Sequence, residues 1–229
     1  MEEIEVTILM PCLNEENTIE TCIKKAQMFL NENNVKGEIL IADNGSTDSS
    51  KLIAKQNGAR VVEVPKQGYG SALINGSKQA KGKYTIMGDC DDSYNFLEIM
   101  PILEQLREGA ELVIGNRYKG KMQKGAMKFL HRVIGTPLIS ALGKMKYKIK
   151  VNDFNCGLRG YETKKVNNLG CKCEGMEYAT EMLIKAKKHN LKIVEIPINF
   201  YKDGRNRQPH LRTFQDGIRH MRLIFGREK

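Results

Sequence analysis

Short apolar runs alternate with segments of helical spacing through the first half of the chain. The runs are rich in aliphatic and β-branched residues and are predicted as strands over Val6–Met10, Glu38–Ala42, Arg60–Val64, Lys83–Met87 and Glu111–Ile114. Helices are predicted over Thr18–Asn31, Ser49–Asn57, Gly70–Ala80 and Phe96–Arg107. Strands that alternate with helices build a mainly parallel sheet flanked by helices, so we expect an α/β protein.

The length and the hydrophobic content of the chain fit one compact domain. The sequence has 229 residues, of which 41% are hydrophobic. We expect the main domain over residues 1–210 and an amphipathic helix over 211–229. No apolar stretch approaches the ~20 residues of a membrane-spanning helix, and the acidic start of the chain does not resemble a signal peptide. These features predict a cytoplasmic protein.

Cysteine and histidine are too scattered to form a disulfide framework or a zinc centre. Only Cys171 and Cys173 of the six cysteines are close in sequence, and this pair lacks the second half of a zinc site. The four histidines are dispersed along the chain. We therefore expect reduced thiols.

Polar residues follow the predicted strands at their carboxyl ends. Right-handed crossovers bring these ends to one edge of a parallel sheet, where open α/β sheets bind their ligands. Asp89, Asp91 and Asp92 place three carboxylates in four positions at that edge, and their mutual repulsion favours a bound cation. Oxygen ligands suit Mg²⁺ or Mn²⁺, and a solvated acidic turn is the alternative.

Motifs occur in order after the first four predicted strands, at residues 11–16 (PCLNEE), 43–48 (DNGSTD), 68–70 (GYG) and 88–92 (GDCDD). In this order they resemble family 2 glycosyltransferases of the GT-A fold, a Rossmann-like sheet flanked by helices. Residues 115–118 (GNRY), 153–159 (DFNCGLR) and 175–177 (GME) are most similar to the branch that acts on dolichyl and other polyprenyl phosphates. Two positions depart from the family pattern: Asn44 stands where a second Asp is usual, and Cys90 where Ala is frequent.

The resemblance implies a nucleotide-sugar donor site in these loops. The implied donor-binding residues are Pro11, Asn14, Glu16, Asp43, Gly68, Gly70, Asp89 and Cys90. The implied ligands of Mg²⁺ or Mn²⁺ are Asp89 and Asp91. The residues themselves also allow Asn14 and Glu16 to act as helix caps.

The implied reaction is an inverting, in-line transfer of a hexose, with the metal stabilising the leaving nucleoside diphosphate. The expected catalytic residues are Asp91, Arg117, Asp153 and Arg205, with Asp153 as the general base if the acceptor is a hydroxyl. The expected acceptor-binding residues are Arg159, Glu177, Arg207 and Arg212. A surface ion pair is the alternative for Arg117, and a cap on the helix predicted over Met176–His189 is the alternative for Glu177.

Positive charge is concentrated in the second half of the chain. Residues 1–100 carry 10 Lys/Arg and 15 Asp/Glu, whereas residues 101–229 carry 27 and 12. Residues 116–150 mix ten Lys/Arg and no carboxylate with apolar residues, which is typical of interfacial helices. We therefore expect a polyprenyl phosphate acceptor and peripheral contact with an anionic membrane, at its cytoplasmic face. The apolar side of the terminal helix could equally pack on the domain, on a second copy of the chain or on a membrane-protein partner.

Three other functions stay open. The first is transfer to a soluble hydroxyl acceptor. The second is a sugar nucleotidyltransferase, which the acidic, glycine-free loop at residues 11–16 disfavours. The third is an RNA-binding or other anion-binding module, but aromatic residues make up only 7% of the chain and no RNA-binding motif is present, so we do not expect nucleic acid.

Overall fold

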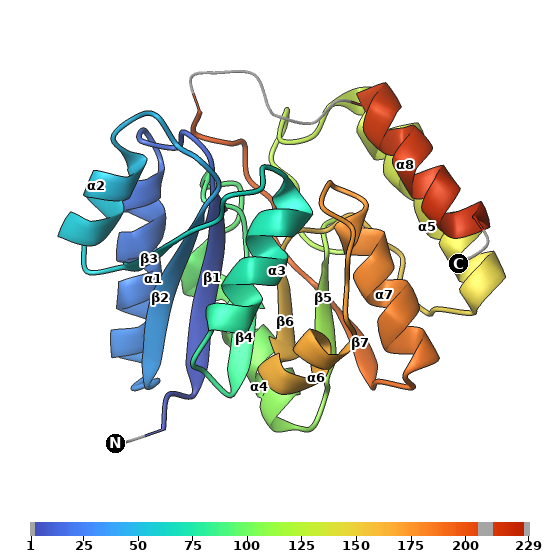
Figure 1. The fold of residues 1–229 in the computed structure, drawn as a ribbon. Coiled ribbons are helices and arrows are strands. Elements are labelled where there is room, and N and C mark those ends of the chain that lie inside the picture. The colour runs from blue at the N-terminus through green and yellow to red at the C-terminus, as the bar shows by residue number, and fades with distance from the viewer. Residues whose placement is uncertain (1–2, 206–212, 227–229) are drawn as a thin grey trace.

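A seven-stranded sheet forms the centre of the computed structural model, which describes residues 3–205 and 213–226 (Figure 1). The strand order is β3-β2-β1-β4-β6-β5-β7. The strands are β1 (Val6–Cys12), β2 (Gly37–Asp43), β3 (Arg60–Glu63), β4 (Tyr84–Met87), β5 (Leu112–Asn116), β6 (Arg159–Glu162) and β7 (Ile193–Pro197). Strand β6 is antiparallel to both of its neighbours, and the other pairs are parallel.

The sheet confirms the predicted α/β class with a mainly parallel arrangement. Strands β1 to β5 coincide with the five predicted runs, whereas β6 and β7 were not predicted. The central strands β1 and β4 are buried along almost their whole length. Burial on both faces explains why these strands read as continuous apolar runs and do not alternate with polar residues.

Helices cover both faces of the sheet. They are α1 (Ile19–Glu32), α2 (Ser50–Gln56), α3 (Tyr69–Gln79), the 3-10 turn η1 (Phe96–Glu98), α4 (Met100–Arg107), the π-helical turn η2 (His131–Gly135), α5 (Thr136–Tyr147), α6 (Thr163–Asn168), α7 (Tyr178–Lys188) and α8 (Thr213–Phe225). Helices α3, α6 and α7 lie on one face, and α1 and α4 lie on the other (Figure 1). Helix α1 shows why: its buried residues, among them Ile19, Ile23, Ala26 and Leu30, repeat at helical spacing and form one apolar stripe.

Helices α5 and α8 lie side by side at the end of the molecule furthest from α2 (Figure 1). Helix α8 also packs against α7, and Ile224 on α8 is completely buried. The Nζ of Lys146 and the hydroxyl of Tyr147 both donate to the carbonyl oxygen of Ile224, at 2.6 and 3.2 Å. The amphipathic helix predicted near the C-terminus therefore packs on the domain itself. Within residues 3–205 and 213–226, no helix is long and apolar enough to cross a membrane.

Candidate active site

A cavity of about 650 Å³ opens at the carboxyl ends of the strands. The end of β1, the loops after β1, β2, β3 and β4, and the start of α3 contribute Pro11, Cys12, Glu15, Asn44, Gly68, Tyr69, Asp89, Cys90 and Asp91. The second half of the chain contributes Arg117, Lys128, Thr136, Asn155, Gly157, Met176, Arg205, Asp216, Arg219 and His220. The cavity thus collects most of the motifs at the sheet edge where the sequence predicted a ligand.

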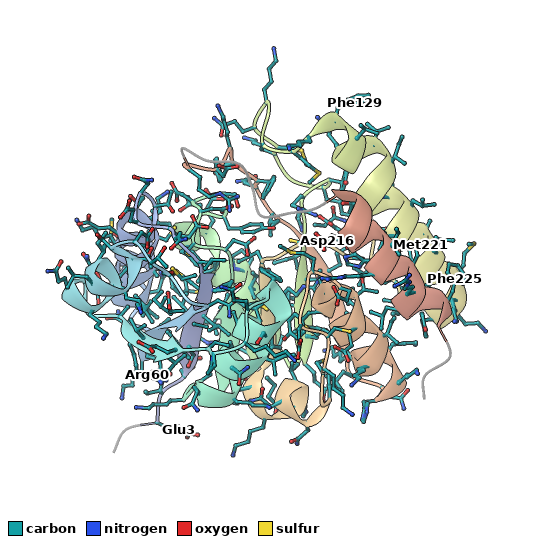
Figure 2. All side chains as sticks on the ribbon, turned by 45° about the horizontal axis from the view of Figure 1, so that its top comes forward. Glu3, Arg60, Phe129, Asp216, Met221 and Phe225 are labelled. Carbon is teal, nitrogen blue, oxygen red and sulfur yellow. The ribbon has the colours of Figure 1, made fainter. Side chains whose placement is uncertain are left out.

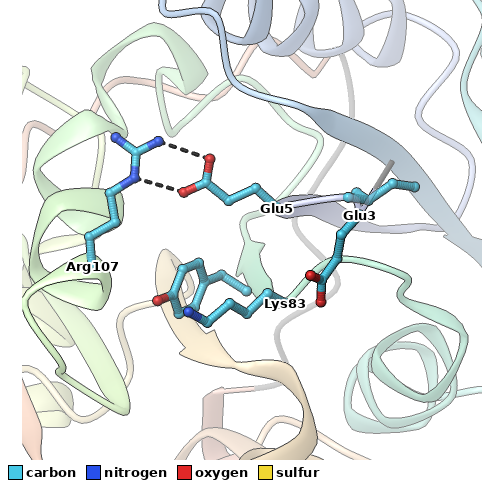
Figure 3. Close-up of a pocket in the computed structure, with 6 residues that line it drawn as sticks. Glu3, Glu5, Lys83 and Arg107 are labelled. Atoms are coloured by element: carbon cyan, nitrogen blue, oxygen red, sulfur yellow. Dashed lines mark hydrogen bonds and ion pairs between the residues drawn. The ribbon is translucent and has the colours of Figure 1, made fainter. Parts of the chain in front are cut away.

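A second, smaller pocket of about 280 Å³ lies at the other end of the strands, where β1 and β4 begin (Figure 3). Its charged groups neutralise one another, because Arg107 donates to both carboxylate oxygens of Glu5 at 2.7 and 2.9 Å. This pair lowers the pKa of Glu5. None of the motifs falls in this pocket, so the cavity at the carboxyl ends is the candidate active site.

The three clustered carboxylates have three different environments. Asp89 accepts a hydrogen bond from the hydroxyl of Tyr69, and its other oxygen, Oδ1, is buried with no hydrogen-bond partner among the described residues. Asp91 accepts from the backbone and the hydroxyl of Ser93 at 3.0 and 2.6 Å. Asp92 has a left-handed φ of 64° and pairs with Lys25 at 2.7 Å. Of these three carboxylates, Asp89 and Asp91 line the cavity and Asp92 does not.

The Asp89–Asp91 pair fits a divalent cation. Burial and the neighbouring charge of Asp91 raise the pKa of Asp89 to about 6, so the charged form of this carboxylate is destabilised in a way that a bound cation would relieve. A Cβ atom at Gly157 would lie 2.9 Å from Oδ2 of Asp89, so a glycine there leaves the carboxylate free to be approached. Among the described residues, no group of three or more His, Cys, Asp or Glu could hold a metal. Diphosphate and water oxygens would have to complete the shell, as is usual for Mg²⁺.

Arg205 reaches the same carboxylates from the end of the described segment that follows β7. Its Nη2 lies 2.6 Å from Oδ2 of Asp91, and its Nη1 lies 3.4 Å from Oε1 of Glu15. Its side chain is largely buried. The sequence predicted Arg205 as a catalytic residue, and the structure brings it into direct contact with the predicted metal ligand Asp91.

Arg117 and Asp153 form a buried ion pair. The Nε and Nη2 of Arg117 donate to the two carboxylate oxygens of Asp153 at 2.7 and 2.8 Å, and the guanidinium lies 5.2 Å from the centre of the Phe200 ring. Arg117 lines the cavity, whereas Asp153 is completely buried and does not. A surface ion pair was the alternative for Arg117, but the pair is buried. The geometry does not support Asp153 as a general base, because Arg117 occupies both of its oxygens.

Arg159 and Glu177 also differ from their expected acceptor roles. Arg159 is completely buried and donates to the carbonyl oxygens of Cys156, Ala179 and Phe154 at 2.7–2.8 Å. It therefore holds β6 and α7 together and does not reach the cavity. Glu177 precedes α7 as its N-cap residue without a capping hydrogen bond, and it does not line the cavity either. Arg207 and Arg212 lie outside the described residues.

The loop after β1 turns different side chains into the cavity from those predicted. The Oδ1 of Asn14 accepts from the backbone of Thr47, and Oε2 of Glu16 accepts from the backbone of Ser49, so both join this loop to the one after β2. Asp43 is buried and accepts from the backbone of its own turn at Gly45 and Ser46. None of these three carboxylate or amide groups lines the cavity.

Three residues that the sequence did not single out for the donor site line the cavity instead: Glu15, Asn44 and Tyr69. Asn44 accepts from the backbone of Gly68 at 2.6 Å and donates to the carbonyl of Lys66, so the residue that departs from the family pattern fixes the loop before α3. The sequence did contain a signal for Tyr69, which stands between two glycines of a motif.

The two glycines of the GYG motif are required by close packing against another loop. Gly68 has a φ of 143°, and a Cβ atom there would lie 2.2 Å from the carbonyl oxygen of Glu174. At Gly70 a Cβ atom would lie 2.2 Å from the carbonyl oxygen of Cys173. Gly68 lines the cavity together with the predicted donor residues Pro11 and Cys90.

Metal affinity is expected to fall as the pH drops below about 6. The pKa of Asp89 is raised to about 6, so below that pH the carboxyl holds a proton that must leave before the oxygen can bind a cation. The Kd for Mn²⁺ should rise about tenfold per pH unit in that range, because one proton is released per cation bound. Calorimetric titration of Mn²⁺ between about pH 5 and pH 7.5 measures this, and a constant Kd would contradict it.

Comparison with known proteins agrees with this geometry. Residues 7–170 match the family model for glycosyl transferase family 2. The chain is 35% identical over 220 residues to the low-salt glycan biosynthesis hexosyltransferase Agl6 of Haloferax volcanii, which covers 96% of this chain and 52% of that protein. It is 28% identical over 215 residues to the glycosyltransferase AglJ of the same organism, with 93% and 68% covered. The chain thus spans about half the length of the first of these relatives.

Solved structures show the same fold. Glucosyl-3-phosphoglycerate synthase from Mycobacterium tuberculosis, in complex with Mn²⁺, UDP and glucosyl-3-phosphoglycerate, superposes with a TM-score of 0.74 at 22% identity, covering 98% of this chain and 81% of that one. The same enzyme with Mg²⁺ and UDP gives a TM-score of 0.76 at 22% identity, with 98% and 80% covered.

The sheet, its helical layers and the carboxylate pair at its carboxyl edge define an α/β protein of the GT-A fold, as the resemblance of the motifs implied. The match of the family model over most of the chain shows that it belongs to glycosyl transferase family 2.

Proposed function

We propose that this protein is a hexosyltransferase that uses a nucleoside diphosphate sugar as its donor. The observation that carries the proposal is the pair Asp89 and Asp91 in the cavity, with a buried carboxylate oxygen that has no hydrogen-bond partner among the described residues. The family and the name of the relative Agl6 support hexosyl transfer. The complexes of glucosyl-3-phosphoglycerate synthase with UDP and Mn²⁺ or Mg²⁺ support the donor class and the metal.

The residues of the cavity have distinct proposed roles. Asp89 and Asp91 would hold Mg²⁺ or Mn²⁺, and a divalent ion there would stabilise the charge that develops on the leaving diphosphate. Tyr69 and Ser93 orient the two carboxylates through the hydrogen bonds described above. Arg205 contacts Oδ2 of Asp91, so a cation bound there would take over this oxygen and leave the guanidinium to face the diphosphate. We propose a single in-line displacement, which inverts the anomeric configuration and is read out by proton NMR of the product.

An acceptor that carries a phosphate fits the cavity best. Lys128 and Arg219 line the cavity in addition to the paired Arg117, and all three belong to the basic second half of the chain. A phosphate arrives with its negative charge, since its second pKa is ~6, and it needs cations for positioning more than a base. Because Arg117 donates to both oxygens of Asp153, a phosphate acceptor is favoured over a hydroxyl acceptor that would need Asp153 as its general base.

Two sources of this phosphate are compatible with the proposal. The first is a soluble compound whose hydroxyl receives the sugar, as phosphoglyceric acid is a ligand of the structural neighbour. The second is a polyprenyl phosphate presented at a membrane. The second source is favoured by one observation, an exposed apolar surface on η2, α5 and the segment before them, formed by Phe129, Leu130, Val133, Ile134, Leu138 and Met145.

Helix α8 adds a further exposed aromatic residue, Phe225, to this helix pair. Phe129 is 76% exposed and Phe225 is 54% exposed, and Figure 2 shows them at opposite ends of the paired helices, on the side away from the sheet. Lys128 precedes the apolar residues in sequence, and Arg132 stands between Leu130 and Val133. Basic and apolar groups in this combination bind anionic membrane surfaces, with ~1 kcal/mol for each cation near the leaflet.

The donor is tested by the thermal stability of the protein with UDP-, GDP- and dTDP-sugars, each with and without Mn²⁺. We expect one nucleotide class to raise the Tm, and only when Mn²⁺ is present. Stabilisation without metal would contradict the metal-dependent site. No stabilisation by any of the donors would contradict the proposed function.

The acceptor is tested with a radiolabelled donor and two acceptors offered separately. Label that enters the organic phase with polyprenyl phosphate, together with salt-sensitive flotation on anionic but not neutral vesicles, would support the lipid source. Label on phosphoglyceric acid without vesicle binding would support the soluble source. Transfer only to uncharged hydroxyl compounds would overturn the phosphate-bearing acceptor.

A further inference from the structure

We propose that Cys12 and Cys90 form a redox-sensitive dithiol in the wall of the donor cavity, which hydrogen peroxide closes to a disulfide that weakens donor binding. The consequence for the donor rests on the proposed function, whereas the disulfide itself does not. Both residues are free cysteines that line the cavity. Neither was predicted to take part in redox chemistry.

Cys12 is the last residue of β1, and Cys90 lies in the turn that follows β4, the strand beside β1. Strands β1 and β4 are parallel, with Ile8 paired to Ile86 and Leu9 paired to Met87. Beyond these pairs the backbone of Gly88 still donates to the carbonyl oxygen of Leu9 at 3.1 Å, so the turn that holds Cys90 starts beside β1.

The thiols are already in contact. The side chains of Cys12 and Cys90 are hydrogen-bonded to each other. The Sγ of Cys90 also donates to the carbonyl oxygen of Pro11 at 3.0 Å, and the Sγ of Cys12 lies 3.7 Å from the hydroxyl of Ser46. The main chain therefore already presents the sulfur atoms to each other.

Peroxide is small enough to reach this pair through the cavity, and the reaction balances without a further reagent. The sulfur of one thiol attacks a peroxide oxygen, the O–O bond breaks, and a sulfenic acid and one water form. The second sulfur then attacks the sulfenic sulfur, the S–O bond breaks, and the second water leaves with the remaining thiol proton. Two thiols are oxidised to one disulfide, and one peroxide is reduced to two waters.

The position of Cys90 explains the effect on the donor. It stands between the two proposed metal ligands, Asp89 and Asp91, and its carbonyl oxygen accepts from the hydroxyl of Thr18 at 2.7 Å. An S–S bond of about 2.05 Å is much shorter than a contact between two thiols, so its formation must pull the loop of residues 89–91 toward β1. The two carboxylates then lose the spacing that a shared cation requires.

The experiment treats the full chain with hydrogen peroxide, removes the peroxide with catalase and blocks the remaining thiols. Peptide mapping by mass spectrometry under non-reducing conditions should find Cys12 linked to Cys90. The affinity for UDP with Mn²⁺, measured by calorimetry, should fall at least about tenfold, which is ~1.4 kcal/mol. Treatment with dithiothreitol should restore it.

Variants separate this pair from the other cysteines, each compared with its own reduced form. Cys12→Ser and Cys90→Ser should lose the response to peroxide, whereas Cys22→Ser, at a buried site on α1 that does not line the cavity, should keep it. Absence of the linked peptide, or an unchanged UDP affinity once it has formed, would overturn the proposal. If the reduced protein bound no nucleoside diphosphate, the proposed function would fall, while the peptide map would still test the disulfide.

Discussion

Asp89→Asn and Asp91→Asn are each expected to abolish metal-dependent binding of the donor while leaving the protein folded. Both carboxylates line the cavity. The Oδ1 of Asp89 has no hydrogen-bond partner among the described residues, so no protein group there takes the place of a cation. Removing groups that merely support a metal ligand costs about 10–100-fold in affinity, so losing a ligand should cost on the order of 100-fold or more. Calorimetry with Mn²⁺ and UDP measures the loss.

Asp92→Asn is the matched control for these two variants. Its carboxylate pairs with Lys25 outside the cavity, and asparagine tolerates the left-handed backbone at this position. The donor affinity should stay within about twofold of the wild type, because only a half-buried ion pair outside the cavity is lost. An Asp92→Asn protein as weak as Asp89→Asn, or an Asp91→Asn protein with wild-type affinity, would show that the metal site is assigned to the wrong carboxylates.

Asp153→Asn is expected to destabilise the fold by about 3–5 kcal/mol, because it leaves the buried charge of Arg117 without its partner. Both oxygens of Asp153 accept from Arg117, and Asp153 is completely buried. Urea unfolding measures the change. A general-base role would give the opposite pattern, with unchanged unfolding and a large fall in turnover.

The double variant Arg117→Met/Asp153→Leu is the control for this prediction. Replacement of a buried ion pair by apolar residues of similar size is often neutral or stabilising, so the double variant should recover most of the stability that Asp153→Asn loses. It should still transfer sugar poorly, because the cavity has lost the guanidinium of Arg117. A double variant that unfolds as easily as Asp153→Asn would contradict the ion-pair account.

Much of the sheet could be predicted because most of its strands are recognisable from their own residue composition. Strands β1 to β5 are apolar runs separated by helices, and each lies where it was predicted. Strand β6 has only four residues, including Arg159 and Glu162, and it is stabilised by β4 and β5 on its two sides. Strand β7 is an edge strand of partly exposed residues. Such strands are specified by their neighbours more than by their composition.

In the candidate site, too, some residues could be identified from the sequence and others are placed only by the fold. The sequence identified Asp89 and Asp91 by their place after a buried strand, the family resemblance implied Arg205, and the structure brings the three together. The consecutive polar residues 14–16 gave no sign of which one faces the cavity. The left-handed φ of 57° at Asn14 and its contact with Thr47, 33 residues away, turn Glu15 inward.

Arg159 was misjudged for a related reason. Nothing in the sequence distinguishes an arginine that binds a ligand from one that bonds to three carbonyl oxygens inside the protein. Burial of the guanidinium depends on how α7 packs against the loop before β6. That packing is a property of the assembled fold.

Crystals of the protein with Mn²⁺ and UDP test the central claim most directly, through an anomalous difference map at a wavelength where manganese scatters strongly. The account predicts one manganese peak between the carboxylates of Asp89 and Asp91, at about 2.0–2.3 Å from an oxygen of each, with the diphosphate of UDP completing its shell. A peak elsewhere, or UDP bound outside the cavity at the carboxyl ends of the strands, would contradict it.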